Sequence, residues 1–333
     1  MTPIFIFSAP RTGSTLLQRI LSSHTDIATT PEPWILLPLI SMSKQGTHLS
    51  SYSSQVSTQA INSFTQEIDN NNYNNKNNNN NNYNELLADF VLSLYQGAIQ
   101  GDESFFIDKT PRYYYIIDEI INLFPNAKFI FLFRNPVQMY ASVLTTWCNN
   151  SFFKLYRNKD DLYLAPKLLS NAYVKYKDIS LAVNYDDLVS NNKNECNKIV
   201  TYLGIQEDLT TSFECETNCF NKGQMGDPTG QIKYTSVSTE SINSWREVFN
   251  NPFRKWYLKR YIDLLGDAVA SAHAYDRANI KQEIDSLPSK GLLHAVKDIA
   301  KDIVGAFYQH LVYKFKLNLL FSSKHKNNNG FFD

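Results

Sequence analysis

The sequence is poor in cysteine, glycine and proline, and it has no excess of charge of either sign. Its 333 residues include four cysteines, too few for a disulfide scaffold, and 12 glycines and 12 prolines, too few for a collagen-like or Pro/Gly low-complexity chain. The 32 basic residues balance the 32 acidic ones, so the chain lacks the positive field that non-specific nucleic-acid binding requires. We therefore expect no nucleic-acid partner.

Long apolar runs and zinc-type cysteine patterns are also missing. The first ten residues, MTPIFIFSAP, hold neither a basic leader nor an apolar run of signal or anchor length. Cys215 and Cys219 lie four residues apart without a second pair or a nearby histidine, so they do not match a zinc site. We expect a soluble, cytoplasmic protein with reduced thiols, no transmembrane segment and no metal.

Hydrophobic residues make up 43% of the chain and aromatic residues 14%, enough for a sizeable core. Residues 3–8 form a short apolar run typical of a buried parallel strand, and residues 127–133 and 179–184 resemble it. Helical periodicity follows each of these runs. The alternation predicts an α/β fold with a mainly parallel sheet flanked by helices. Further segments with helical patterns are 85–99, 115–124, 137–147 and 193–205, the last ending at Gly204 as a C-cap.

Two segments stand apart from this pattern. Residues 70–84 hold 12 asparagines and cannot bury enough apolar surface to fold, so we expect a disordered loop insertion at about 68–84. From about residue 290 an amphipathic helix is expected. We predict one α/β domain over residues 1–277 and a helical extension over residues 278–333 with a disordered end.

The apolar stripe of the predicted C-terminal helix has three interpretations. The pattern favours a helix docked on the protein's own core through this stripe; a homodimer or partner interface and membrane-surface binding are the alternatives. The stripe consists of Leu292, Val296, Ile299, Ile303, Phe307 and Leu311, and the opposite face carries Lys297, Asp298, Lys301 and Asp302.

The turn between the first strand and first helix, Ser8 to Thr15 (SAPRTGST), has the composition of a phosphate-binding loop. Compared with the nucleoside triphosphate loop GxxxxGK[ST], this turn has Gly13 at the second glycine, but Ser14 stands where that loop has its lysine. The cation lies instead within the loop, at Arg11, whose forked donors suit phosphate or sulfate oxygens.

A second anion site is predicted after the strand at 127–133. Arg134 follows this strand, Pro136 suits the first turn of a helix, and Ser142 lies about two turns further along. Ligands bind at the carboxyl ends of strands in open α/β sheets, so a charged fork and a hydroxyl at this edge fit a second phosphate.

These two motifs, APRTGSTLL and FLFRNPVQMYAS, resemble those of sulfotransferases that use 3′-phosphoadenosine 5′-phosphosulfate (PAPS). The resemblance implies a P-loop-like three-layer fold. It also implies that Arg134 and Ser142 bind the 3′-phosphate. The residues that it places on the 5′ side are Arg11, Thr12, Gly13, Ser14 and Thr15.

The match looks like the branch with PRSGTTLL-type loops, which includes tyrosylprotein and bacterial-type sulfotransferases. By this resemblance Glu32, 21 residues after Arg11, corresponds to the acidic general base, Lys109 to the central lysine and Tyr185 to the late tyrosine. GDPTGQIKY resembles the late cofactor-covering loop, with residues 226–233, Lys233 included, as candidates. Thr146 stands where the tyrosylprotein enzymes carry a second arginine, which argues against a tyrosylprotein substrate.

The implied reaction is in-line sulfuryl transfer to an acceptor hydroxyl, without a metal. Arg11 and Lys109 would stabilise developing charge, and Glu32 would take the acceptor proton, with His24 as the alternative base. The acceptor is expected to be a small-molecule or lipid-like hydroxyl, and Trp34, Trp147 and the tyrosines 113–115 are candidates for its pocket. The alternatives are a divergent P-loop small-molecule kinase and a catalytically silent nucleotide-binding or scaffold protein.

Overall fold

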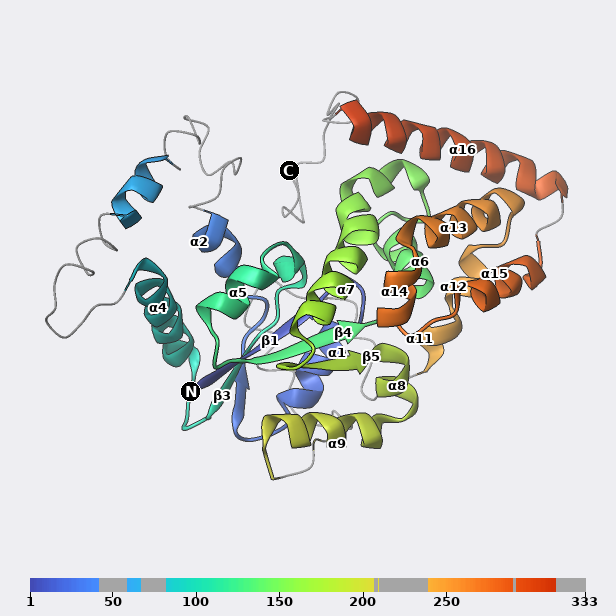
Figure 1. The fold of residues 1–333 in the computed structure, drawn as a ribbon. Helices are drawn as coiled ribbons and strands as arrows, with labels where there is room; N and C mark the ends of the chain where they lie inside the picture. Colours follow the sequence, from blue (N-terminus) through green and yellow to red (C-terminus); the bar gives the residue numbers. More distant parts are fainter. Residues whose placement is uncertain (42–58, 67–81, 207–208, 210–238, 290–291, 316–333) are drawn as a thin grey trace, which may run out of the picture.

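The computed structural model describes residues 1–41, 59–66, 82–206, 209, 239–289 and 292–315, and within them five strands form one all-parallel sheet (Figure 1). The strand order is β2-β3-β1-β4-β5, so the chain starts at the centre, places β2 at one edge, inserts β3 between them and adds β4 and β5 on the other side. The predicted α/β fold with a parallel sheet is therefore confirmed. The strands are β1 (Thr2–Ser8), β2 (Ile27–Thr29), β3 (Phe105–Asp108), β4 (Lys128–Phe133) and β5 (Ser180–Asn184).

The two central strands separate phenylalanine from aliphatic residues by simple alternation. Phe5 and Phe7 of β1 belong to the core on one face of the sheet, and Ile4 and Ile6 belong to the core on the other. Strand β4 repeats this pattern, and its Phe129 pairs in register with Phe5. Since side chains of a strand point alternately to opposite faces, the run PIFIF is apolar on both sides and requires a helical layer on each.

Helices supply those layers and complete a three-layer sandwich (Figure 1). The aliphatic face packs on α1 (Ser14–Leu21), α8 (Tyr185–Ser190) and α9 (Asn192–Leu203). The helices of the aromatic side are α2 (Leu36–Ser41), α4 (Tyr83–Ala98), α5 (Ile117–Leu123), α6 (Pro136–Thr146), α7 (Ala165–Tyr176), α12 (Trp245–Val248), α13 (Pro252–Leu265), α14 (Asp267–Ala272) and α15 (Arg277–Ser286). Shorter helical segments are η1 (Pro111–Tyr115), η2 (Phe152–Asn158), the π-helical η3 (Asp160–Leu164) and α11 (Glu240–Asn243).

Local signals set several helix ends. Gly204 ends α9 with φ 77°, in the left-handed region, as its predicted C-cap role requires. Asn82 begins α4 with a capping box, because its side chain accepts the Glu85 amide while the Glu85 carboxylate accepts the Asn82 amide. The last asparagines of the predicted insertion therefore belong to the start of α4. Residues 68–81 of that insertion lie outside the described residues.

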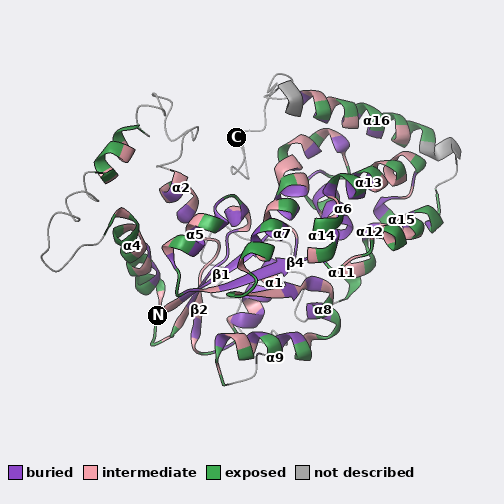
Figure 2. Ribbon diagram, viewed as in Figure 1, coloured by how far each residue is buried: buried purple, intermediate pink, exposed green. Residues whose placement is uncertain are grey.

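The C-terminal helix α16 (Leu292–Phe315) docks on η2 and α13, but not as its periodicity predicted. The stripe residues Val296, Ile303 and Phe307 are 58%, 47% and 64% exposed, whereas Asp302, predicted to face solvent, is buried. Figure 2 shows that much of the surface of α16 is exposed. The prediction that α16 docks through its apolar stripe is thus wrong.

A polar network and a glycine explain the orientation of α16. Arg254 of α13 binds both carboxylate oxygens of Asp302, with Nε–Oδ2 at 2.7 Å and Nη2–Oδ1 at 3.0 Å, and Asn251 donates to the same carboxylate. Gly305 permits close contact with η2, because a Cβ there would lie 2.9 Å from the Phe153 nitrogen. Burying this paired charge fixes which face of the helix turns inward.

No helix among the described residues combines the length and apolarity needed to span a bilayer.

Replacing Asp302 by alanine is expected to loosen α16, because Arg254 would be left buried without its carboxylate partner. The free energy for opening this helix should fall by about 3–5 kcal/mol, measured as faster hydrogen–deuterium exchange over residues 296–312. The matched control is Lys301→Ala on the exposed side of the same helix, which should leave exchange unchanged. Equal protection in both variants would contradict the proposed anchoring.

The expected homodimer through α16 stays a prediction, and the outward stripe is the surface that it would bury. The double variant Ile303→Ser/Phe307→Ser should convert a dimer into a monomer in light scattering coupled to gel filtration, because it removes most of the apolar contact. Val174→Ser on α7, 68% exposed, is the control for loss of any exposed apolar side chain. A monomeric wild-type protein at high concentration would refute the dimer.

Candidate active site

Each strand of the sheet ends at its carboxyl edge beside one of the predicted site residues. Because the strands are parallel, these ends lie along a single edge of the sheet, where ligands of open α/β proteins bind. The residues that follow the strands, in the order β1 to β5, are Arg11, Glu32, Lys109, Arg134 and Tyr185. The fold therefore gathers side chains that are far apart in the sequence.

The loop after β1 has a constrained backbone. Arg11 has φ 65° and Gly13 has φ 93°, so both lie in the left-handed region. A Cβ on Gly13 would lie 2.3 Å from the Tyr185 ring, and only glycine fits both requirements. Gly13 is also the N-cap of α1 and brings no side chain to cap its first amides. An N-terminus without a side-chain cap, at a strand's carboxyl end, has the donors and the dipole that attract an anion.

The rest of the loop is tied to its surroundings. The buried Thr12 hydroxyl donates to the Ala9 carbonyl at 2.7 Å, and Ser14 is buried in the first turn of α1. Thr15 accepts a hydrogen bond from Lys109 Nζ at 3.4 Å. These contacts join the loop after β1 to the end of β3.

The two predicted anion sites meet in space. Arg11 Nε donates to Ser142 Oγ of α6 at 3.1 Å, and Arg134 Nη1 donates to the Arg11 carbonyl at 3.0 Å. The Arg11 guanidinium also lies 5.9 Å from the centre of the Trp147 ring, at the end of α6. The first loop and the second strand–helix turn thus form one connected cluster of cations.

Arg134 is buried and held from several sides. Its Nε donates to Gln138 Oε1 at 2.9 Å and its Nη2 to the Ser241 carbonyl at 3.1 Å, while its guanidinium stacks 4.2 Å from the centre of the Tyr185 ring. Burial lowers the pKa of His273 to about 4, so this ring is neutral, and its Nδ1–H donates to the Arg134 carbonyl at 2.7 Å. The arginine is therefore preorganised.

Glu32 and Lys109 form a buried ion pair with Oε1–Nζ at 2.7 Å. The lysine side chain is 1% exposed and the glutamate 11%, so each charge depends on the other for compensation. The Trp34 indole donates to the second carboxylate oxygen, Oε2, at 3.0 Å. Both oxygens of Glu32 are thereby oriented by fixed donors.

Some groups at this edge were missed by the sequence analysis. Asp108, the last residue of β3, is fully buried, and burial raises its pKa to about 6 against the opposing effect of hydrogen bonds from Tyr95 and Tyr113. An acidic residue closing an apolar strand was the available signal. Tyr113 and Tyr114 are buried with bonded hydroxyls, which leaves Tyr115, 41% exposed, as the accessible member of the tyrosine run.

Other predicted features lie outside the described residues. These are the late loop at 226–233 with Lys233 and the cysteines Cys215 and Cys219. Within the part of the chain that is described, no group of three or more His, Cys, Asp or Glu side chains is placed to hold a metal ion.

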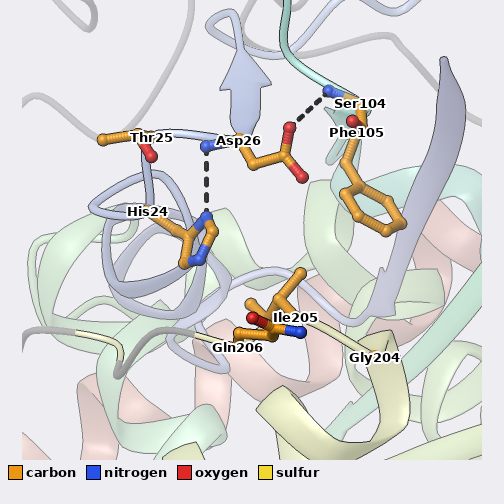
Figure 3. Close-up of a pocket in the computed structure, with 8 residues that line it drawn as sticks. All are labelled: His24, Thr25, Asp26, Ser104, Phe105, Gly204, Ile205 and Gln206. Carbon is orange, nitrogen blue, oxygen red and sulfur yellow. Dashed lines mark hydrogen bonds between the residues drawn. The ribbon is translucent and has the colours of Figure 1, made fainter.

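His24 lies at the opposite end of the sheet from this cluster. It lines a cavity of about 370 Å³ with Asp26, Phe105 and Gln206, beside the amino ends of β2 and β3 (Figure 3). Its Nδ1 accepts the Asp26 amide at 3.1 Å. This position disfavours His24 as the alternative to Glu32.

Similar proteins of known structure share the fold. The sulfotransferase domain of the Synechococcus PCC 7002 olefin synthase is 22% identical, with a TM-score of 0.52 over 82% of this chain and 95% of that domain. The sulfotransferase domain from the curacin biosynthetic pathway is 20% identical, with a TM-score of 0.51 over 82% of this chain and 97% of that domain. At these identities the likeness establishes the fold alone.

Sequence comparisons identify relatives directly. The nodulation protein NoeE of Sinorhizobium fredii (strain NBRC 101917 / NGR234) is 33% identical over 143 residues, which cover 43% of this chain and 31% of that protein. The chain thus matches about a third of the length of this curated relative. The family model described as the sulfotransferase family matches residues 3–208, more than half of the chain. This protein therefore belongs to the sulfotransferase family.

Proposed function

We propose that the protein transfers a sulfuryl group from PAPS to an acceptor hydroxyl by in-line displacement, with Glu32 as the general base. The observation that carries this proposal is the buried Glu32–Lys109 pair beside the α1 N-terminus that no side chain caps. A carboxylate, an ammonium group and backbone amides that no side chain caps then lie at one edge of the sheet, and sulfuryl transfer between oxygens requires such positioned charges and donors.

The residues at this edge fit such a nucleotide. Loop amides after β1 and the Arg11 guanidinium suit the 5′-phosphosulfate, because they combine a helix dipole with a planar fork of donors. Ser142 and Arg134 lie next to Arg11 and suit the 3′-phosphate. When bound, PAPS would supply an activated sulfuryl group on a phosphate leaving group.

Glu32 and Lys109 have complementary roles in the proposed reaction. Glu32 takes the proton of the acceptor hydroxyl as that oxygen attacks sulfur. Its carboxylate then becomes neutral, and the positive charge of Lys109 loses its counter-charge. The Lys109 ammonium, which also contacts Thr15 of the loop, can now stabilise the negative charge that grows on the leaving phosphate oxygen. One proton transfer therefore redirects the charge of the lysine toward the leaving group.

Arg134 and Tyr185 support the loop in this scheme. Arg134 donates to the Arg11 carbonyl, and the Tyr185 ring packs against Gly13, so both residues hold the backbone that faces the nucleotide. Arg134 would thus shape the 5′ side of the donor site while it binds the 3′-phosphate.

Two tryptophans define the side from which an acceptor would approach. Trp34 is half-buried beside Glu32, and Trp147 is 39% exposed beside Arg11. We propose an acceptor with an apolar body and a hydroxyl, a small molecule or a lipid-like alcohol, because aromatic rings offer apolar surface next to the base.

The variant Glu32→Gln should lower kcat by about 10²- to 10⁴-fold, because the amide cannot take the acceptor proton. Turnover would be measured with ³⁵S-labelled PAPS and a panel of phenols and long-chain alcohols. Glu247→Gln, at an exposed position on α12, is the matched control and should keep wild-type turnover. Full activity of Glu32→Gln would remove Glu32 as the base.

Binding of adenosine 3′,5′-bisphosphate tests the donor site without any acceptor. Isothermal calorimetry should show binding to the wild type and about 10- to 100-fold weaker binding to Arg11→Ala, the loss expected for one charge-assisted contact. Arg260→Ala, exposed on α13, controls for loss of a positive charge. Absence of binding to the wild type would refute the donor site, and preferential binding of Mg-ATP would favour the kinase alternative.

A further inference from the structure

The carboxylate of Asp108 gathers three hydroxyl groups at the end of β3. Its Oδ2 accepts from Tyr95 of α4 at 2.5 Å and from Tyr113 of η1 at 2.8 Å, and its Oδ1 accepts from Thr110 at 3.1 Å. Asp108, Thr110 and Tyr113 are completely buried, and Tyr95 nearly so. A buried carboxylate with this many donors is a fixed part of the structure.

Two of the three hydroxyls continue to the segment after β2. Thr110 Oγ1 accepts the Trp34 amide at 3.3 Å, and the Tyr113 hydroxyl accepts the Leu36 amide at 3.4 Å. A hydroxyl has a single proton, and each of these two hydroxyls donates it in the hydrogen bond to Asp108. The two hydroxyl oxygens can therefore act only as acceptors toward the backbone amides of Trp34 and Leu36. Tyr95 donates to the same carboxylate, but its contact does not continue to this segment.

The segment held in this way orients Glu32. Trp34 has φ 58°, a conformation that a bulky residue adopts only when its surroundings enforce it. Its indole donates to Glu32 Oε2, so any relaxation of the Trp34 backbone would move a donor of the carboxylate. Lys109, next to Asp108 in the chain, binds the other oxygen of Glu32.

We infer that Asp108 is a positioning residue for sulfuryl transfer, acting through Thr110 and Tyr113 on the strained Trp34 turn and so on the proposed base Glu32. The inference rests on the proposed function for its catalytic consequence. Its structural part, the anchoring of residues 34–36, stands apart from any substrate.

The charge state of Asp108 agrees with this role. Burial raises its pKa to about 6, while hydrogen bonds from Tyr95, Tyr113 and Thr110 and the positive charge of Lys109 oppose the shift. Above that pH the ionised carboxylate can accept from all three hydroxyls.

Paired variants separate positioning from general stability. Tyr113→Phe and Thr110→Val remove hydroxyls that contact the segment, whereas Tyr95→Phe removes one that does not, and Thr110→Ser restores the acceptor. Two readouts are needed. One is hydrogen–deuterium exchange over residues 33–37 in the free protein. The other is kcat with ³⁵S-labelled PAPS and whichever of 4-nitrophenol and 1-dodecanol the wild type sulfates better, together with the Kd for adenosine 3′,5′-bisphosphate.

Tyr113→Phe and Thr110→Val should exchange faster over residues 33–37 and lose about 10- to 100-fold in kcat at unchanged bisphosphate affinity. Tyr95→Phe and Thr110→Ser should stay within about twofold of wild type in both readouts. Equal exchange in all four variants, or equal loss of kcat in Tyr95→Phe and Tyr113→Phe, would overturn the inference. A wild type that sulfates neither alcohol would count against the proposed function for these acceptors, and the exchange data would still decide the anchoring.

Discussion

The buried ion pair between Lys109 and Glu32 is the constraint on which the arrangement of this site depends. A lysine side chain that is 1% exposed needs a counter-charge in contact, and the turn after β2 supplies it with Glu32. That turn crosses the end of β3, and Trp34 within it adopts the left-handed backbone conformation, with φ 58°. The hydroxyls of Thr110 and Tyr113 accept hydrogen bonds from backbone amides of this turn, and both hydroxyls donate to the Asp108 carboxylate.

A second set of contacts runs across the other half of the sheet. Arg134, after β4, donates to the Arg11 carbonyl after β1 and stacks on Tyr185 after β5, whose ring leaves room only for Gly13. Three strand ends thereby determine one loop conformation. The rigid aromatic and aliphatic cores beneath them keep these strand ends in register, which is why contacts of about 3 Å between distant segments are sustained.

The sequence was informative where local pattern and structure agree. The runs around Phe5 and Phe131 identify parallel strands inside the sheet, and motifs identified the loop at Arg11 and the residues Glu32, Lys109 and Arg134 as candidates. Strands β2 and β3, of three and four residues, were missed because such short runs carry little periodicity. The orientation of α16 was mispredicted because Asp302 finds its partner, Arg254, in another helix. Periodicity reports which residues are apolar, but a buried ion pair depends on tertiary neighbours.

The contact between Gly13 and Tyr185 has a consequence for how this protein can change over evolutionary time. Any side chain at position 13 would be strained by the left-handed backbone, and it would also require a smaller side chain at position 185, which removes the surface on which Arg134 rests. A single substitution at either position is therefore costly, and paired replacements must also supply a new support for the arginine. We therefore expect few accepted substitutions at positions 13 and 185.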